Sequence, residues 1–440
     1  MAASRKNISF RSLAFFGAVL LAGANAQAQV GYPPTYNADG TVTMKVQAAN
    51  AAKVTVVPTG KPNGLSATDI DMVKGTDGTW TATIKPVRPG FHYYNLNVDG
   101  MVVIDPGATL YWVYWNNTPG LDIPDPKLDF YVAKDVPHGV VREQLYHSKL
   151  TGKLRRATVY TPPGYDQSTD RYPVLYLQHG ASENEEGWTK QGRAQFIMDN
   201  LIAEKKAVPF IIVMDYGYAT PPGEPTIPTG ADGRRGSGGG RGGARGGARG
   251  AAPAGGAPAA GAPAAGAAGP GAAAGAGGPG GARGGGRGGA AGPSLFEQVM
   301  LQELIPTIDR EFRTKADRDH RAIAGLSMGG GQAMTIGSTH MDIFGSIGAF
   351  HAGGGGSTLN VATSFNGAYA NTADVNAKMR LIFIAAGSLD GLFNSNNAMH
   401  TAMETAGIKH TFFVTEESHE WQPWRKDLHA MAQLLFTEKK

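Results

Sequence analysis

Residues 321–330 read RAIAGLSMGG, a short apolar run that leads directly into Gly-Leu-Ser-Met-Gly. Such a run is typical of a buried strand, and the following residues, Gly330 to His340, are compatible with a helix. A strand, a sharp turn and a helix in this order are what a nucleophile elbow requires. Gly325 and Gly329 have no Cβ atoms, so chain segments can crowd there while Ser327 sits on a strained turn with its hydroxyl exposed. We therefore predict that Ser327 is a nucleophile within an α/β-hydrolase fold.

A histidine and an acid must accompany this serine, because a serine hydroxyl attacks poorly until a base removes its proton. In an α/β-hydrolase the acid follows the serine in the chain, and the histidine follows the acid. Asp390 comes just after the apolar strand expected over 381–386, and His419 comes after the next strand, over 411–414. We predict that these two residues complete a catalytic triad at the carboxyl edge of the sheet.

The sequence offers alternatives for the acid. Glu416 and Glu417 lie three and two residues before the histidine and are alternatives to Asp390 for orienting the imidazole. Other histidines lie within expected helices or just before a strand, where they are poorer bases: His400, His410 and His429.

The oxyanion that forms during acyl transfer needs two backbone N–H donors. One is expected from Met328, directly after the nucleophile. The other is expected from the loop after the strand over 174–178, with Ala181 as the preferred donor. Gly180 lets the backbone approach the substrate, and His179 is interpreted as a structural residue that shapes this loop.

The chain after Asp135 alternates short apolar strands with helical patterns, which is typical of a parallel sheet covered on both faces. Pro306 should kink or divide the helix expected over 295–312. The expected elements are strands over 155–160, 173–178 and 209–214, and helices over 192–205 and 295–312.

The chain from Val30 to about Asp125 consists of short strands and turns. Turn signals about every ten residues indicate a β-sandwich. Asp99-Gly100 suits a two-residue hairpin turn between the fourth and fifth strands. The expected strands are 42–46, 54–57, 79–84, 91–98 and 101–104.

Four blocks of this front region resemble the early-set immunoglobulin-like domain grouped with carbohydrate-binding module family forty-eight: DGTW at 77–80, PGFHYY at 89–94, VDG at 98–100 and DP at 105–106. The resemblance implies an immunoglobulin-like sandwich that either binds glucans or only packs against a catalytic domain. The aromatic cluster over 111–115 suits both roles, because its rings can stack on sugars or fill the seam between domains.

Five further blocks resemble the putative-esterase group of carbohydrate esterase family one: PHG at 137–139, VYTPPGY at 159–165, YLQHG at 176–180, GLSMGG at 325–330, and HEW at 419–421 with WR at 424–425. That family includes feruloyl and acetyl xylan esterases, and its fold is similar to that of enterochelin esterases and mycolyltransferases. The resemblance assigns the triad roles to Ser327, Asp390 and His419. Phe350-His351-Ala352-Gly353 departs from the family, whose members tend to have a small Ser-Gly pair there.

The first 28 residues have the layout of a secretory signal peptide: basic residues, an apolar run over 13–24, and small-residue sites ending at Ala26 and Ala28. The run is too short to span a membrane. We expect a bacterial protein exported to the periplasm or beyond, with an uncleaved anchor as the alternative.

Residues 230–294 contain almost only Gly, Ala, Pro and Arg. Such a segment cannot bury enough area to offset its ordering entropy, so we expect a disordered insertion, which is a second departure from the family. Its Arg-Gly-Gly repeats resemble RNA-binding tails, a function that export disfavours. The formal charge of +4 comes from this segment and the leader, and the remaining chain carries more acidic than basic residues. The absence of cysteine excludes disulfides, thiolate metal sites and thiol nucleophiles.

The predicted organisation is a signal peptide over 1–28, an all-β immunoglobulin-like domain over 29–125 and an α/β-hydrolase esterase domain over 126–440. The predicted function is a secreted serine esterase that removes acyl groups, with feruloyl as the predicted group, from plant polysaccharide or oligosaccharide, without a metal or organic cofactor. Alternatives are an acetyl xylan esterase, a siderophore esterase and a non-catalytic carbohydrate-binding protein. Nucleic acid and, after cleavage, membrane are not expected partners, and the oligomeric state is not predicted.

Overall fold

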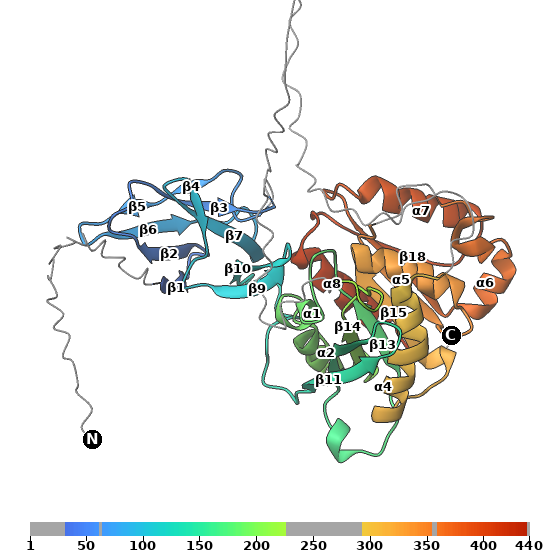
Figure 1. Cartoon of the computed structure of the whole chain (residues 1–440). Coiled ribbons are helices and arrows are strands. Elements are labelled where there is room, and N and C mark those ends of the chain that lie inside the picture. Colours follow the sequence, from blue (N-terminus) through green and yellow to red (C-terminus); the bar gives the residue numbers. More distant parts are fainter. Residues whose placement is uncertain (1–30, 61–63, 226–292, 354–358, 438–440) are drawn as a thin grey trace, which may run out of the picture.

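The computed structural model describes residues 31–60, 64–225, 293–353 and 359–437. Within them, an all-β unit lies beside an α/β unit (Figure 1). The predicted signal peptide over 1–28 and nearly all of the predicted insertion over 230–294 lie outside the described residues.

The all-β unit consists of two antiparallel sheets, with the orders β1-β2-β6-β5 and β4-β3-β7-β10-β9, and β8 pairs with β7. Alternate residues of these strands point into a shared apolar core that includes Val42, Val54, Trp80 and Leu96. The prediction of an all-β front region is therefore confirmed. The strands are β1 (Gly31–Tyr36), β2 (Val42–Gln47), β3 (Val54–Pro58), β4 (Ile70–Asp71), β5 (Val73–Lys74), β6 (Thr79–Ile84), β7 (Gly90–Val98), β8 (Met101–Val103), β9 (Thr109–Val113) and β10 (Asn116–Ile123).

The hairpin between β7 and β8 has the predicted turn. Val98 pairs with Met101, and the two residues between them, Asp99 and Gly100, have φ angles of 51° and 88°. Two successive positive φ angles match the right-handed twist of the strands, which is why Asp-Gly is favoured at this position.

The α/β unit is built on one sheet of eight strands in the order β11-β12-β14-β13-β15-β16-β17-β18. From β14 to β18 the neighbours are parallel, as predicted, whereas β12 is antiparallel to both β11 and β14. The short turn between β11 and β12 leaves no room for a crossover, so this edge must be a hairpin. The strands are β11 (Val140–Ser148), β12 (Lys153–Thr161), β13 (Val174–Gln178), β14 (Ile211–Asp215), β15 (Arg321–Leu326), β16 (Ser346–Phe350), β17 (Leu381–Gly387) and β18 (Thr411–Thr415).

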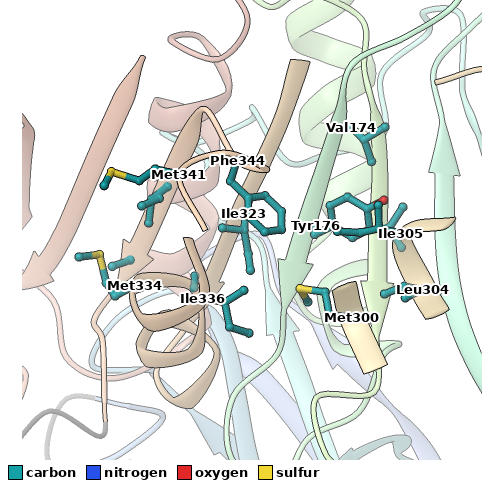
Figure 2. Close-up of a cluster of buried hydrophobic side chains, with 14 of the residues drawn as sticks. Val174, Tyr176, Met300, Leu304, Ile305, Ile323, Met334, Ile336, Met341 and Phe344 are labelled. Carbon is teal, nitrogen blue, oxygen red and sulfur yellow. The ribbon is translucent and has the colours of Figure 1, made fainter. Parts of the chain in front are cut away.

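Helices cover both faces of this sheet, and each face has its own apolar core. Val174 and Tyr176 of β13 point into the core shown in Figure 2, with Met300, Leu304 and Met334 of the covering helices. Leu175 and Leu177 point to the opposite face, as the period of two in a strand requires. The helices are α1 (Gly187–Lys190), α2 (Ala194–Ala203), α3 (Leu295–Val299), α4 (Ile305–Glu311), α5 (Met328–Thr339), α6 (Thr372–Lys378), α7 (Phe393–Thr405) and α8 (Trp421–Ala432). None of these described helices is long and apolar enough to cross a membrane.

The helix predicted over 295–312 is divided near Pro306, as expected. A π-helical turn over Met300–Leu304 separates α3 from α4, and Pro306 lies in the first turn of α4. Proline has no N–H for the helical ladder, so the change in hydrogen-bond spacing falls just before it. Ser294 and Glu297 form a capping box that starts the helix.

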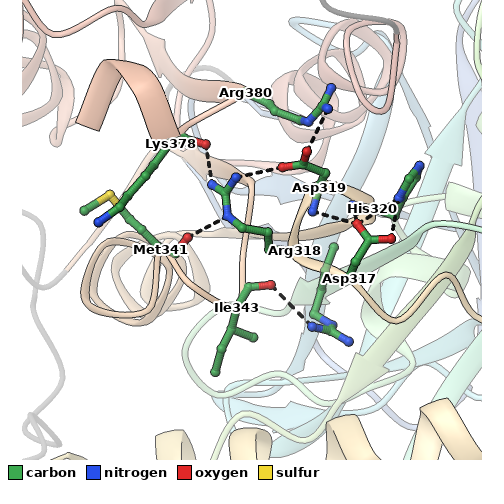
Figure 3. Close-up of polar contacts among 9 residues, drawn as sticks. Asp317, Arg318, Asp319, His320, Met341, Ile343, Lys378 and Arg380 are labelled. Carbon is green, nitrogen blue, oxygen red and sulfur yellow. Dashed lines mark hydrogen bonds and ion pairs between the residues drawn. The ribbon is translucent and has the colours of Figure 1, made fainter. Parts of the chain in front are cut away.

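A polar network links segments at the amino ends of the sheet strands, opposite their carboxyl ends (Figure 3). The Arg318 guanidinium donates to the carbonyls of Met341 and Lys378 and to the Asp319 carboxylate. Arg380 donates to the other oxygen of Asp319 at 2.8 Å, and this bond lowers the pKa of Asp319. The network ties the segments before β15 and β17 together, so it stabilises the sheet away from the chemistry.

The seam between the two units is built on α8. Arg425, almost fully buried, donates to both oxygens of Asp122 in β10 at 3.0 and 2.9 Å. Burial alone would raise the pKa of Asp122, but Arg425 and then Arg193 lower it overall. Gln422 donates to the Phe91 carbonyl at 2.9 Å. The two units therefore share buried polar contacts as well as apolar ones.

The aromatic cluster over 111–115 divides between two environments. Tyr111 is buried and packs edge-on against Phe91 in a core shared with the α/β unit, which agrees with the seam alternative. Tyr114 and Trp115 form the tip of the β9–β10 hairpin, with φ angles of 54° and 60°, and this tip reaches the α/β unit.

Candidate active site

Ser327 occupies a sharp turn between β15 and α5, with φ 52° and ψ −116°. A Cβ on Gly325 would lie 2.5 Å from the Gly329 carbonyl carbon, and one on Gly329 would lie 2.6 Å from the His179 oxygen. The crowding predicted at both glycines is thus confirmed. Such a backbone conformation costs roughly 1–3 kcal/mol, and it persists only where the surroundings enforce it.

Backbone hydrogen bonds supply that enforcement. The Ser327 N–H donates to the Phe350 carbonyl at 2.9 Å, and the Ser327 carbonyl accepts from Gly331 at 3.1 Å and from Gly353 at 2.8 Å. A Cβ on Gly353 would lie 3.5 Å from Ser327 Oγ, so the segment after β16 lines the nucleophile.

Asp390 and His419, on the loops after β17 and β18, meet at this edge of the sheet. The distance from His419 Nδ1 to Asp390 Oδ2 is 2.7 Å, and Asp390 Oδ1 accepts the Leu392 N–H at 2.8 Å. The His419 side chain is 35% exposed and that of Asp390 is 2% exposed, so the base meets solvent while the acid does not. Among the described residues, Ser327 Oγ makes no hydrogen bond to His419, and in serine enzymes this bond commonly tightens only around substrate.

Asp390 is held ionised by its partners. Burial alone would raise its pKa, but the hydrogen bonds from His351 and His419 lower the pKa of Asp390 well below its usual range. An ionised carboxylate on Nδ1 leaves His419 Nε2 free to accept a proton, which is the tautomer that a general base needs.

Neither alternative acid contacts the histidine. The Glu417 carboxylate lies 2.7 Å from Lys426 Nζ, and Glu416 accepts from Arg88 through its backbone carbonyl. Of the three acids considered, only Asp390 has a carboxylate hydrogen-bonded to His419.

The structure adds a residue that the sequence indicated only as a departure from the family. His351, directly after β16, is fully buried, and its Nδ1 lies 2.6 Å from the same Oδ2 of Asp390 that His419 contacts. Its position at the carboxyl end of a central strand was the sequence signal that could have identified His351 as a residue of the site. The ligand atoms of His351, Asp390 and His419 lie within 4.8 Å of one another, the only such metal-like group in the described ranges. Both Nδ1 atoms already bond to Asp390, so hydrogen bonding explains this cluster.

The loop after β13 passes close to the nucleophile. A Cβ on Gly180 would lie 3.6 Å from Ser327 Cβ. The Gly180 N–H is bonded to Glu183 Oε2 at 2.9 Å, whereas within the described chain the N–H groups of Ala181 and Met328 have no recorded acceptor. These two donors remain our prediction for the oxyanion hole.

His179 is a structural residue in this geometry. Its Nε2 accepts the Gly217 N–H at 2.9 Å, so Nδ1 carries the proton and donates to the Gly180 carbonyl at 2.7 Å. Burial lowers the pKa of His179 to about 4. The ring therefore stays neutral and joins two loops, as the sequence suggested.

Glu183 makes stability depend on pH. Burial raises the pKa of Glu183 to about 7, so the folded state binds a proton that the unfolded state has released between about pH 4.5 and 7. Stability is therefore lost as pH rises through this window. The glutamine of Glu183→Gln does not titrate. We therefore expect the Tm of this variant, relative to the Tm of the wild type at the same pH, to increase from pH 5 to pH 8. The gain at pH 8 should be on the order of 2 kcal/mol.

Thermal unfolding followed by circular dichroism at pH 5, 6, 7 and 8 measures this gain. Glu186→Gln is the matched control, because the wild-type Glu186 carboxylate pairs with Lys190 near the surface. A Glu183→Gln difference that stays constant across the range would contradict the expectation.

The comparisons with known proteins agree with this geometry. The family model described as "Putative esterase" matches residues 148–235 and 287–435. An endo-1,4-beta-xylanase/feruloyl esterase of Xylanibacter ruminicola is 34% identical over 411 residues, covering 92% of this chain and 46% of that protein. The chain thus spans about half the length of this curated relative.

Two solved structures share the fold. A CE1 ferulic acid esterase from Anaeromyces mucronatus matches with TM-score 0.50 and 20% identity, over 70% of this chain and 96% of that one. The enterobactin esterase of Shigella flexneri matches with TM-score 0.53 and 14% identity, over 90% of this chain and 92% of that one. They support an α/β-hydrolase unit. With the family model matching more than half of the residues, the resemblance of the catalytic half to the esterase group is confirmed, and the chain belongs to the "Putative esterase" family, the group expected within carbohydrate esterase family one.

Proposed function

We propose that the protein is a secreted serine esterase that removes feruloyl groups from plant cell-wall polysaccharide. The observation that carries this proposal is the buried Asp390 bonded to His419 on the sheet edge where Ser327 occupies a strained turn. The name of the 34% identical relative supports the acyl group, and the leader sequence supports export.

In this proposal His419 Nε2 takes the proton of Ser327 as Oγ attacks the ester carbonyl. The N–H groups of Met328 and Ala181 stabilise the oxyanion. His419 then protonates the departing sugar oxygen, and the ester C–O bond breaks to leave an acyl-serine. Water, deprotonated by His419, attacks the acyl-serine and releases ferulate and free Ser327.

An aromatic wall beside the oxyanion loop supports a flat acyl group over acetate. Trp115 from the hairpin tip lies 5.0 Å from the ring of Tyr218. The Tyr218 hydroxyl accepts the Ser182 N–H at 2.8 Å, and Ser182 Oγ accepts the Tyr114 N–H at 3.0 Å. Ser182 directly follows Ala181, so these rings flank the proposed oxyanion hole, where a phenolic ring can stack on them.

We further infer that the all-β unit is an immunoglobulin-like early-set domain. Its two packed antiparallel sheets and its four sequence blocks support this identity. In our proposal its role is to place the Trp115 hairpin at the site, and acylated polysaccharide is the partner.

The direct test is hydrolysis of methyl ferulate beside acetylated xylan by the purified protein. We expect release of ferulate. Acetate release alone would keep the mechanism and replace the substrate class. Turnover of neither would contradict the proposal and favour a siderophore-type ester or a binding role.

Trp115→Ala is expected to raise KM for methyl ferulate by roughly two- to tenfold, because a lost aromatic contact is worth roughly 0.5–1.5 kcal/mol. Trp115→Phe should retain most of the affinity, and Tyr32→Ala, on β1, is the control for a lost exposed ring of the same unit. Steady-state kinetics on methyl ferulate and methyl acetate measure the effect. An equal rise in KM for both esters would contradict a wall specific for aromatic acyl groups.

A further inference from the structure

A second histidine–carboxyl pair lies next to Asp390. His351 Nδ1 is 2.6 Å from Asp390 Oδ2, and its Nε2 is 3.5 Å from Oδ2 of Asp427 in α8. The side chains of His351 and Asp427 are both 0% exposed. The mechanism above uses neither residue.

The facing atoms of this pair lack other partners. Within the described residues, His351 Nε2 and both carboxyl oxygens of Asp427 have no hydrogen bond. A buried carboxylate without a partner costs several kcal/mol, so such a group is stable only when it is protonated or paired. Burial, followed by the nearby charge of Glu417, raises the pKa of Asp427 well above its usual range. A small side-chain movement would bring its O–H to His351 Nε2.

A hydrogen bond from Asp427 to His351 would fix which atom is the donor in each hydrogen bond from Asp427 to Asp390. If Nε2 of His351 accepts from Asp427, its Nδ1 must carry the ring proton and donate to Asp390. Burial also lowers the pKa of His351, against the opposing effect of Asp390, which favours the neutral ring. Asp390 Oδ2 then receives two N–H bonds, one from His351 and one from His419.

We propose that His351 and Asp427 are positioning residues for ester hydrolysis, in which uncharged Asp427 orients His351 so that its Nδ1–H shares Asp390 Oδ2 with His419. The inference rests on the proposed serine-esterase mechanism. The shared bond pins the carboxylate and reduces its proton affinity, which limits how strongly Asp390 stabilises protonated His419. His351 thereby keeps His419 unprotonated, and so able to act as a base, at lower pH.

Loss of the His351 donor should therefore raise the proton affinity of His419. The acid limb of the kcat/KM profile reports the base of the free enzyme, so it should move to higher pH by about 0.5–1 unit. The titratable and charged groups that act on His351, Asp427 and the neighbouring Glu420 are Asp390, His419, Glu417, Lys426 and Arg88. The variants below leave all of these groups in place.

The test compares four variants on 4-nitrophenyl acetate, an activated ester that reports the serine machinery whichever acyl group is natural. His351→Leu and Asp427→Leu should move the acid limb upward and lower kcat up to about tenfold. His351→Asn, whose amide can still donate to Asp390, and Asp427→Asn, whose amide can still donate to His351, should keep the limb near the wild-type position. Asp199→Asn, a buried carboxyl in α2, is the control for lost stability alone.

A shift in Asp427→Asn as large as in Asp427→Leu would overturn the uncharged state of Asp427. If the acid limb of the kcat/KM profile stayed at its wild-type pH in both Leu variants, and only the Tm fell, the positioning role would be overturned. Proton NMR covers the case in which the Leu variants fail to fold: two far-downfield ring N–H signals are expected in the wild type, and His351→Asn should lose one of them. A single such signal in the wild type would also reject the proposal, whether or not ferulate is the substrate.

Discussion

Ser327→Ala is expected to lower kcat for methyl ferulate by roughly 10⁴–10⁶-fold. The proposed nucleophile is a single hydroxyl on a turn that the backbone bonds to Phe350, Gly331 and Gly353 hold in place. None of these bonds involves Oγ, so the variant should keep the turn and its affinity for substrate. The residual rate would come from the oxyanion donors and from substrate binding.

The measurement is steady-state hydrolysis, together with the burst of the first acyl-enzyme turnover on 4-nitrophenyl acetate. Ser168→Ala is a matched control, because Ser168 lies in the loop leading to the amino end of β13 and its hydroxyl accepts the Asp170 N–H. We expect an unchanged Tm in both variants within about two degrees. A Ser327→Ala enzyme that retained the burst would remove Ser327 from the mechanism.

Asp390→Asn should combine a loss of kcat of about 10³–10⁴-fold with a loss of stability of about 2–4 kcal/mol. Oδ1 accepts the Leu392 N–H, so the Asn oxygen should stay there and turn its NH₂ group toward both histidines. Donors would then face the Nδ1–H groups of His351 and His419, and both rings would have to change tautomer. His419 would carry its proton on Nε2, where it cannot serve as a base.

Kinetics and chemical denaturation of the same preparation separate the two losses. Glu417→Gln is the matched control, because it removes the alternative acid while leaving Asp390 in place, and it should lower kcat less than threefold. If Glu417→Gln lost activity and Asp390→Asn did not, the acid of the triad would have to be reassigned.

The parts of the fold that the sequence predicted are those with a strong local signal. Central strands such as β15 and β17 are continuous apolar runs bounded by glycine or a polar residue, and their predicted limits lie within one residue of the observed ones. The elbow was recognisable because crowding there excludes any residue with a Cβ, which leaves a spacing of glycines around Ser327.

The parts that the sequence did not predict depend on contacts between distant segments. β11 alternates exposed residues with half-buried or buried ones at the edge of the sheet, so it lacks the apolar run of a central strand. The contact between His351 and Asp390 joins the ends of two neighbouring strands, and strand order cannot be read from a single sequence. The raised pKa of Glu183 likewise arises from tertiary burial alone.

The seam on α8 limits how chains of this kind can recombine. α8 begins almost directly after His419, and three of its side chains, Trp421, Gln422 and Arg425, bind the all-β unit. A chimera that exchanged this unit would leave the Arg425 guanidinium buried without Asp122, on the helix that carries the catalytic histidine loop. The front domain is therefore not an interchangeable module: shuffling it between esterases requires either that the incoming domain carry a carboxylate in the place of Asp122 or that α8 with Arg425 travel with it.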